Sequence, residues 1–373
     1  MGRAAERRDR LLPLLPKEGL DALLISNPVN VTYLTGFTGD SSTVVLTRDR
    51  AILVSDPRYM GQIADECPGL ETFIRPPTQR IAEASAEVLT KLAIHAVGFE
   101  GNGLTVAEFE YLRELAPTMD WKGAADRVER LRLVKDDDEL SRIRGAIAVA
   151  ERAFTAFCAL LRPEDTEIEL CDVLEANIRR AGGQGTSFPP IVAIGDRAAL
   201  PHAPPTNRPV SASEILLVDW GASAGGYKSD LTRVLATRTK SSCARPGGDG
   251  AKLEEVYEVV RQAQEAAIRA VRPGVEARAV DAAARRVIDD AGYGDAFNHG
   301  LGHGIGLQIH EGPSLRANSA DVLAEAMVFT IEPGIYLPGW GGVRLEDDVR
   351  VTADGCEMLT TAPRDLWLLG ANR

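Results

Sequence analysis

Two aspartates in one predicted hairpin are the first residues whose type and spacing indicate chemistry. The stretch EILLVDWGASAGGYKSDLTRVLA reads as two apolar strands joined by a turn of small residues. With the turn centred between Ala224 and Gly225, Asp219 and Asp230 face each other, with Cβ atoms about 4.5–5.5 Å apart. Opposed like charges in an apolar strand pair are destabilising unless a cation lies between them. The alternative is that one aspartate caps the turn and the other is solvated.

A second predicted hairpin carries two glutamates in the same arrangement. MVFTIEPGIYLPGWGGVRLEDDVRVT turns around Pro338-Gly339-Trp340, and a turn centred on Gly339 places Glu332 opposite Glu346. A single buried glutamate commonly has a salt bridge, which Arg344 could supply here. Because the same feature occurs in two hairpins, a local salt bridge is a weaker explanation. Four inward-facing carboxylates predict more than one metal ion.

Histidines form the third group of candidate residues. The chain has five, and three of them, His299, His303 and His310, lie within FNHGLGHGIGLQIHEGP. The glycines of this stretch disfavour a regular helix and favour an extended backbone. On such a backbone His299 and His303 share one face, because their separation is even. A lone histidine is more often a core residue than a ligand, which is our interpretation of His95, whereas the cluster of three predicts a site.

The elements that must position these residues fall into two parts. Short strands and helices alternate up to about residue 130, including a hairpin around Arg48–Asp49, which predicts an α/β domain. The acidic stretch KDDDE then favours the start of a long helix and marks a boundary. We therefore expect one domain at 1–133 and a second at 134–373.

The second part contains a faint internal repeat. A helix ending in Arg162-Pro163 and another ending near Ala181-Gly182 recur 110 residues later, at Arg272-Pro273 and Ala291-Gly292. Glycine-rich strand sequence follows each copy. Two helix-then-strand halves predict a pseudo-symmetric domain with a site between them. The basic segment after Thr237 reads as a surface loop.

Composition limits the class of protein. The chain of 373 residues is too long for one ordinary domain, and its 45% hydrophobic and 26% charged residues are typical of globular proteins. A net charge of −12 argues against nucleic-acid binding, which needs a basic surface. The five scattered cysteines lack a CxxC pair, which favours a reducing compartment. With no apparent signal peptide or membrane-spanning run, we expect a cytoplasmic protein.

Four motifs of the second part occur in the order VDWGASAGGYKSDLTR, HGLGHGIGLQIHEGP, TIEPGIY and VRLEDDVRVT. Together they resemble the pita-bread metallopeptidases, the family of aminopeptidase P, prolidase and methionine aminopeptidase. Nearer the N-terminus, YLTGFTGDSS and SDPRY are similar to the creatinase-type amino domain of aminopeptidase P and prolidase, which methionine aminopeptidases lack. The resemblance covers nearly the whole chain. It implies an α/β (α+β) architecture, with a creatinase-like N-terminal domain and a pita-bread catalytic domain with pseudo-twofold halves.

Matched position by position, the resemblance also implies the site residues. Five would be metal ligands: Asp219, Asp230, His303, Glu332 and Glu346. Asp230 and Glu346 would bridge two ions, Asp219 would bind one of them, and His303 and Glu332 the other. His202, His299 and His310 match histidines that line the substrate site, and Arg344 matches an arginine beside the last glutamate.

The function that follows from the motifs is an Xaa-Pro aminopeptidase, which cleaves between an N-terminal residue and proline. Ligands that are mostly carboxylates favour Mn²⁺, with Co²⁺ or Zn²⁺ as alternatives. Glu332 is our candidate for proton shuttle, and His202 or His310 for binding the carbonyl or oxyanion. His299 and Arg344 would either form the wall of a proline pocket or support the ligands.

Three other functions stay open at this point. The nearest is an Xaa-Pro dipeptidase (prolidase), which differs by recognising the free carboxylate of a dipeptide. More distant are a creatinase-like amidohydrolase and a peptide-binding pseudoenzyme. In the peptidase readings the partner is a peptide or dipeptide with proline at its second position. Relatives often form dimers, so we also expect a homodimer.

Overall fold

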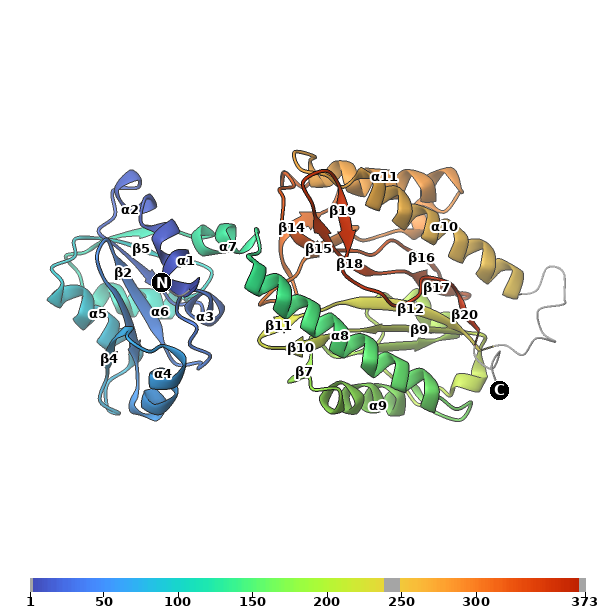
Figure 1. Ribbon diagram of the computed structural model, residues 1–373, viewed down its shortest axis with the longest axis horizontal. Coiled ribbons are helices and arrows are strands. Elements are labelled where there is room, and N and C mark those ends of the chain that lie inside the picture. The colour runs from blue at the N-terminus through green and yellow to red at the C-terminus, as the bar shows by residue number, and fades with distance from the viewer. Residues whose placement is uncertain (1–2, 238–248, 369–373) are drawn as a thin grey trace. The chain divides into compact units, whose positions relative to one another are not determined.

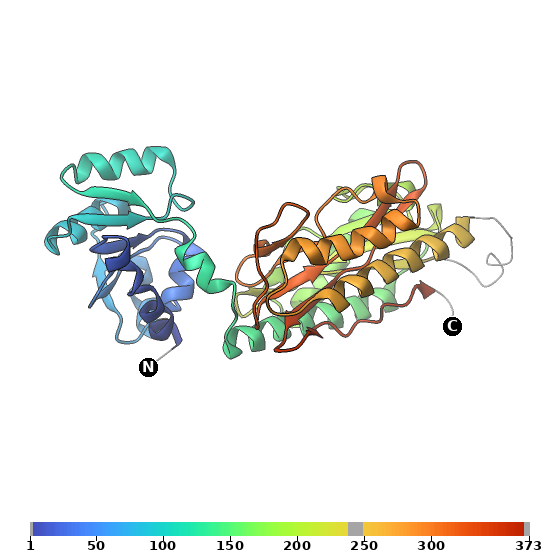
Figure 2. The same ribbon diagram turned by 90° about the horizontal axis from the view of Figure 1, so that it is seen from above.

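The computed structural model describes residues 3–237 and 249–368, so most of the loop predicted after Thr237 lies outside the described residues. The chain divides into two compact units, Met1–Arg132 and Leu133–Arg373. Each unit has its own strands and its own covering helices (Figures 1 and 2). Among the described residues, no helix is both long and apolar enough to cross a membrane.

The N-terminal unit is built on a six-stranded sheet with the strand order β4-β3-β2-β1-β5-β6. Its strands are β1 (Ala22–Ile25), β2 (Thr43–Thr47), β3 (Ala51–Ser55), β4 (Glu71–Ile74), β5 (Ala96–Phe99) and β6 (Asp120–Gly123). Its helices are α1 (Arg3–Leu11), α2 (Leu14–Lys17), α3 (Pro28–Thr35), α4 (Met60–Glu66), α5 (Ile81–Lys91), α6 (Val106–Leu115) and α7 (Arg127–Arg132). The predicted hairpin around Arg48–Asp49 is the β2–β3 pair, which is confirmed.

Four long helices frame the C-terminal unit, in two pairs. They are α8 (Asp137–Leu160), α9 (Glu167–Arg180), α10 (Asp249–Ala270) and α11 (Ala277–Asp290). Figure 1 shows the strands of this unit between α8 with α9 on one side and α10 with α11 on the other. Helices α9 and α11 begin and end 110 residues apart, and each is followed by a glycine of positive φ, Gly182 and Gly292. The predicted internal repeat is therefore confirmed.

The acidic stretch before α8 begins this helix as the sequence predicts. Asp136 accepts a hydrogen bond from the backbone N–H of Glu139, and the Glu139 side chain accepts one from the N–H of Asp136. This reciprocal capping satisfies two donors of the first turn, and the further acids there favour the positive end of the helix dipole.

The strands of the C-terminal unit form four small sheets. A four-stranded sheet, whose side chains pack with those of α8 and α9, contains β8 (Ile191–Ile194), β9 (Ile215–Trp220), β12 (Leu231–Ala236) and β20 (Trp367–Leu368). A five-stranded sheet contains β13 (Gly302–Gly304), β14 (Glu311–Leu315), β15 (Val328–Ile331), β18 (Asp347–Val351) and β19 (Cys356–Met358). The others are β7 (Gly185–Thr186) with β10 (Ala222–Ala224) and β11 (Tyr227–Lys228), and β16 (Gly334–Leu337) with β17 (Gly341–Arg344).

Strand β9 is buried on both faces, which explains its almost continuous apolar sequence. Leu216, Val218 and Trp220 belong to the apolar cluster packed on α8 and α9. Ile215 and Leu217 belong to the cluster packed on α10 and α11. Because side chains alternate along a strand, Asp219 shares the face of Ile215 and Leu217. A carboxylate is thus built into a layer that is otherwise hydrophobic.

The first hairpin has a different register from the one predicted. Its turn is Gly225-Gly226, both at positive φ, and Asp219 pairs with Thr232 rather than with Asp230. Two residues at positive φ make the tight turn whose twist matches the flanking strands, and this favours glycine at both positions. Because the error is two residues, an even number, Asp230 keeps the face of Asp219 and lies diagonally across from it.

The second hairpin has the predicted register. Gly334 pairs with Arg344 in the β16–β17 ribbon, and Ile331 pairs with Asp347 between β15 and β18. Glu332 and Glu346 lie between these two pairs, at the place where the ribbon joins the five-stranded sheet. The two hairpins are joined there, because Thr232 of β12 forms a backbone bridge with Glu346.

Candidate metal centre

One cavity of the C-terminal unit, of about 670 Å³, brings together the predicted site residues. Its lining includes nine of them: Asp219, Asp230, His303, Glu332, Glu346, His202, His299, His310 and Arg344. His95 belongs to the N-terminal unit and does not line this cavity. It is exposed, so its interpretation as a core residue was wrong. The sequence therefore identified a set of residues that the fold places in one cavity, although they come from segments up to 144 residues apart, from His202 to Glu346.

The two aspartates reach the cavity from a closely packed hairpin. At Gly221, next to the strand that carries Asp219, an added Cβ would lie 1.9 Å from the Ser229 carbonyl oxygen. Only glycine permits this approach, which draws the segment before Asp230 against the end of β9. Asp219 and Asp230 are 7% and 4% exposed, and each has one carboxylate oxygen that is buried without a hydrogen-bond partner in the described residues.

His303 lies at the centre of β13, between two glycines that are required by packing. A Cβ at Gly302 would lie 2.1 Å from the Thr330 carbonyl oxygen, and one at Gly304 would lie 1.8 Å from that of Gly312. The HGLGHG pattern therefore reflects strands in very close contact on both sides of the imidazole. The backbone N–H of His303 donates to Thr330 Oγ1 at 3.1 Å.

A potential ligand group is present where the two hairpins meet β13. One donor atom each from Asp230, His303 and Glu346 lies within 4.8 Å of the others. The Nε2 of His303 is 3.5 Å from Asp230 Oδ2 and 3.6 Å from Glu332 Oε1. Buried oxygens without partners, close together and beside an imidazole, are the donor set that suits divalent cations. The residues present therefore fit a metal centre.

Electrostatics of the protein alone give the same indication. Burial raises the pKa of Asp230 and of Glu346 well above the usual range, and neighbouring carboxylates raise both further. Burial raises the pKa of Glu332 to about 8, although Arg344 opposes the shift. Burial also lowers the pKa of His303 to about 4, so its imidazole is neutral and able to bind metal at pH 7. Bound cations would offset the repulsion between the neighbouring carboxylates, which is one cause of the raised pKa values of Asp230 and Glu346.

Arg344 lies beside the last glutamate, as predicted, and its guanidinium is fully engaged. It donates to Asp219 Oδ2, to Thr232 Oγ1 at 3.0 Å and to Tyr336 Oη at 2.9 Å. Thr232 in turn donates to Glu346 Oε2 at 2.7 Å. The nitrogens of Arg344 are thus bonded to Asp219 directly and to Glu346 through Thr232, as expected for the second of the two roles that the sequence left open, support of the ligands.

His299 is held by the same network. Its Nε2 lies 2.8 Å from Tyr336 Oη, and its Nδ1 lies 2.8 Å from the Gly300 carbonyl oxygen. The carbonyl can only accept, so Nδ1–H donates this hydrogen bond and Nε2 accepts one from the tyrosine hydroxyl. Burial lowers the pKa of His299 to about 4, which agrees with a neutral ring. Tyr336 has an even spacing from Gly334 and Glu332, which places all three on one face, although this pattern alone does not indicate a role for the tyrosine.

The remaining two histidines are exposed at the cavity. His310 packs edge-on against His303, with ring centroids 4.3 Å apart, and burial of its inner part lowers its pKa. His202 follows Pro201 and precedes Ala203 and two further prolines, which form an apolar wall with Phe188. Arg316 also lines the cavity and was missed by the sequence analysis, because nothing in its local pattern marks it.

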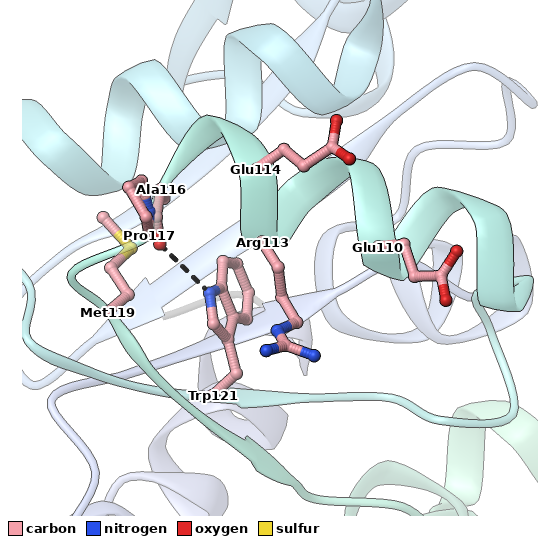
Figure 3. A pocket seen from close by; sticks show the side chains of 7 residues that line it. All are labelled: Glu110, Arg113, Glu114, Ala116, Pro117, Met119 and Trp121. Carbon is pink, nitrogen blue, oxygen red and sulfur yellow. Dashed lines mark hydrogen bonds between the residues drawn. The ribbon is translucent and has the colours of Figure 1, made fainter.

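A different cavity, of about 470 Å³, lies in the N-terminal unit, between α6 and the segment leading into β6 (Figure 3). Its lining includes Met119 and Trp121, whose indole N–H donates to the Ala116 carbonyl at 3.4 Å. Glu110 and Glu114 lie on successive turns of α6, and both line the cavity (Figure 3). This cavity has no histidine among its lining residues and no converging carboxylates, so it lacks the features of a metal site.

The fold and this centre define a class of protein, and comparison with known families agrees. Residues 141–353 match the model of metallopeptidase family M24, and residues 7–134 match the creatinase/prolidase N-terminal domain. The chain belongs to metallopeptidase family M24. It is a metal-dependent peptidase with a pita-bread catalytic domain and a creatinase-type N-terminal domain.

Individual relatives refine this assignment. The chain is 36% identical to an Xaa-Pro dipeptidase of Lactobacillus delbrueckii subsp. lactis, over 97% of this chain and 98% of the relative. It is 32% identical to an Xaa-Pro dipeptidase of Pyrococcus furiosus, over 97% and 99%. Among solved structures, an Xaa-Pro dipeptidase from Bacillus anthracis superposes with a TM-score of 0.91 at 35% identity, over 98% of this chain and 100% of that one. An X-Pro aminopeptidase from Thermotoga maritima gives 0.86 at 34%, over 96% and 100%.

Proposed function

We propose that this protein is an Xaa-Pro dipeptidase that uses two divalent cations. The residues that would hold these ions are Asp219, Asp230, His303, Glu332 and Glu346. The observation that carries the proposal is the convergence of donor atoms from Asp230, His303 and Glu346. Asp219 and Asp230 each add a buried oxygen that has no hydrogen-bond partner in the described part of the chain. Mn²⁺ is the expected metal, because oxygen ligands outnumber nitrogen ligands. The expected homodimer and cytoplasmic location belong to the same proposal.

Divalent cations bound there would supply Lewis-acid polarisation of the scissile carbonyl and a water of lowered pKa. The protein supplies the remaining groups. Glu332 is the proton shuttle to the leaving proline nitrogen, because its side chain remains 16% exposed while it lies 3.6 Å from His303. His202 and His310 are exposed at the cavity and can donate to the substrate carbonyl as charge develops on its oxygen.

The choice of a dipeptidase over an aminopeptidase corrects the preference drawn from the sequence motifs. Several relatives at 31–36% identity over nearly the full chain are named Xaa-Pro dipeptidases. Arg316 supplies a matching feature, since it is exposed, lines the cavity, and its guanidinium makes no hydrogen bond or ion pair within residues 3–237 and 249–368. A free guanidinium suits the carboxylate of a substrate that ends at proline. The aminopeptidase stays the second candidate, because one similar structure is named so.

The test is a substrate panel with the Mn²⁺-reconstituted full chain. It compares an Xaa-Pro dipeptide, the same dipeptide with its carboxylate amidated, and an Xaa-Pro-Yaa tripeptide. We expect the dipeptide to have a kcat/KM about ten- to a hundredfold above the amide, because a hydrogen bond to a charged group is worth roughly 1.5–3 kcal/mol. The Arg316→Met variant should lose that preference. Faster cleavage of the tripeptide than of the dipeptide would support the aminopeptidase instead.

A further inference from the structure

A fully buried arginine lies behind the metal centre, on the other side of the strands that carry the ligands. Arg233 of β12 is 0% exposed, and each of its donor nitrogens is bonded. Its acceptors are one carboxylate oxygen and four carbonyl oxygens: Asp347 Oδ1 (2.6 Å), Glu346 O (2.7 Å), Ala362 O (2.8 Å), Thr232 O (2.9 Å) and Pro363 O (2.9 Å). A planar guanidinium with five donors in fixed directions can bond all five at once, and an ammonium cannot.

Two of these acceptors belong to the backbone bridge between the hairpins. The Glu346 N–H donates to the Thr232 carbonyl at 3.2 Å, and Arg233 Nη1 donates both to that carbonyl and to the carbonyl of Glu346. Arg233 therefore fixes the backbone on both sides of the crossing. The Glu346 carboxylate starts from this backbone, and its Oε2 accepts from the side chain of Thr232.

The other acceptors connect the C-terminal segment to this crossing. Ala362 and Pro363 bond Arg233 through their carbonyls. The N–H of Ala362 donates to Glu151 of α8 at 2.7 Å, and the Arg364 carbonyl accepts from Tyr257 of α10 at 3.0 Å. The segment thus bonds to both helix pairs and, through Arg233, to the point where the two halves meet.

Asp347 holds the guanidinium in its plane and is itself enclosed. It is 1% exposed, and its oxygens accept from Thr360 Oγ1 at 2.6 Å and from Gln264 Nε2 at 2.9 Å as well as from Arg233. Neither Arg233 nor Asp347 is among the residues that line the cavity. Their effect on the centre must therefore pass through the backbone of Thr232 and Glu346.

We propose that Arg233 is a positioning residue for the metal centre, and that the segment Thr360–Pro363 is part of the same support. This inference rests on the proposed two-metal function. Arg233 sets where the Glu346 carboxylate lies relative to Asp230. It thereby determines the affinity of the centre for divalent cations. Removing a partner that orients a metal ligand costs about 10–100-fold in metal affinity.

The experiment measures Mn²⁺ binding to the full chain by titration calorimetry, with the metal-free melting temperature recorded for each variant. Arg233→Lys keeps the charge and removes the fixed geometry, so we expect Mn²⁺ affinity at least about tenfold weaker and kcat lowered with little change in KM. The matched control is Arg75→Lys in the N-terminal unit, where Arg75 also bonds a buried aspartate, Asp56, and a backbone carbonyl. The control should bind Mn²⁺ like the wild type.

Asp347→Asn separates positioning from charge neutralisation. The asparagine keeps the oxygen that accepts from Arg233. Its amide can donate to Gln264 Oε1, which has no partner among the described residues, once the Gln264 amide turns over and gives up the 3.3 Å bond from its Nε2 to the Ile331 carbonyl. We expect Mn²⁺ affinity within about threefold of wild type, and this variant also serves if Arg233→Lys does not fold. Wild-type affinity in a folded Arg233→Lys protein, or a tenfold loss in Asp347→Asn, overturns the inference. Absence of Mn²⁺ binding by the wild type would instead overturn the proposed function.

Discussion

The two halves of the C-terminal unit share a frame and differ in what they place on it. Helices α9 and α11 have the same length and the same offset from the preceding helix, and each is followed by a glycine of positive φ. The strands that follow differ, because the first half contributes two aspartates from one hairpin. The second contributes two glutamates from a hairpin and a histidine from a separate strand, β13. The two halves thus share the lengths and spacing of their helices, and they differ in the candidate ligands that their strands contribute.

The carboxylates of the two halves also differ in their support. Asp219 and Asp230 each keep one buried oxygen that has no partner among the described residues, although the other oxygen of Asp219 accepts from Arg344. Glu346 accepts from Thr232, and Glu332 has Thr330 nearby at 3.5 Å. The first half therefore depends more on bound cations, whereas the second is partly satisfied by the protein itself. The predictions below test this difference.

The largest expected effect is on catalysis, from one ligand of each half. Asp230→Asn and Glu346→Gln should each lower kcat by about a thousandfold or more, because loss of a shared ligand removes several kcal/mol of transition-state stabilisation and about 1.4 kcal/mol is tenfold. Circular dichroism should show an unchanged fold. Turnover like the wild type in either variant would defeat the dinuclear centre.

The second effect is on the stability of the metal-free protein as pH changes. Burial raises the pKa of Glu332 to about 8 from 4.5, so the folded protein holds a proton that the unfolded chain has released. Its contribution to stability is therefore lost as pH rises from about 4.5 to about 8. Asp230 and Glu346, whose pKa values are also raised, act in the same direction.

This is measured by thermal melts of chelator-treated protein across that pH range, with and without added Mn²⁺. The melting temperature should fall with pH in the metal-free protein and stay nearly level with Mn²⁺. Asp230→Asn should reduce the slope and raise the metal-free melting temperature at pH 8, and the slope that remains reports the glutamates of the second half. A metal-free protein that becomes more stable towards pH 8 would contradict the proposed crowding of carboxylates.

The sequence predicted the residues of the centre better than it predicted their geometry. Alternation of apolar residues with single carboxylates identified both hairpins, and a turn centred on Gly339 fixed the second register. The first register failed because the small residues from Ala222 to Gly226 allow several turns, and only the need for positive φ at two positions selects Gly225-Gly226. Arg316, Tyr336 and Arg233 could not be assigned roles, because what they contact is distant in sequence.

The glycines that permit close strand approach should give the third effect, on stability. Gly221→Ala in the first half and Gly302→Ala in the second place a Cβ 1.9 and 2.1 Å from a backbone oxygen, which cannot move as a side chain could. Each should cost about 3 kcal/mol or more of unfolding free energy in urea melts, at the upper end for overpacking. Gly145→Ala, in an exposed turn of α8 with open space around it, is the control and should stabilise by about 0.5–1 kcal/mol. Equal stability of Gly221→Ala and wild type would mean that the strands separate easily there.

The smallest effect concerns the helices that the two halves share. Helix α9 begins with a capping box, in which Thr166 and Glu169 bond each other's backbone N–H, whereas α11 begins at Glu276 without a side-chain cap. Thr166→Ala should therefore cost about 1 kcal/mol of unfolding free energy. Moving the box to α11, as Glu276→Thr with Ala279→Glu at two exposed positions, should add a few tenths to about 1 kcal/mol. Both variants should keep kcat and Mn²⁺ affinity, because neither helix start reaches the cavity. A change in Mn²⁺ affinity in either variant would show that the stability of these helix starts affects the metal centre.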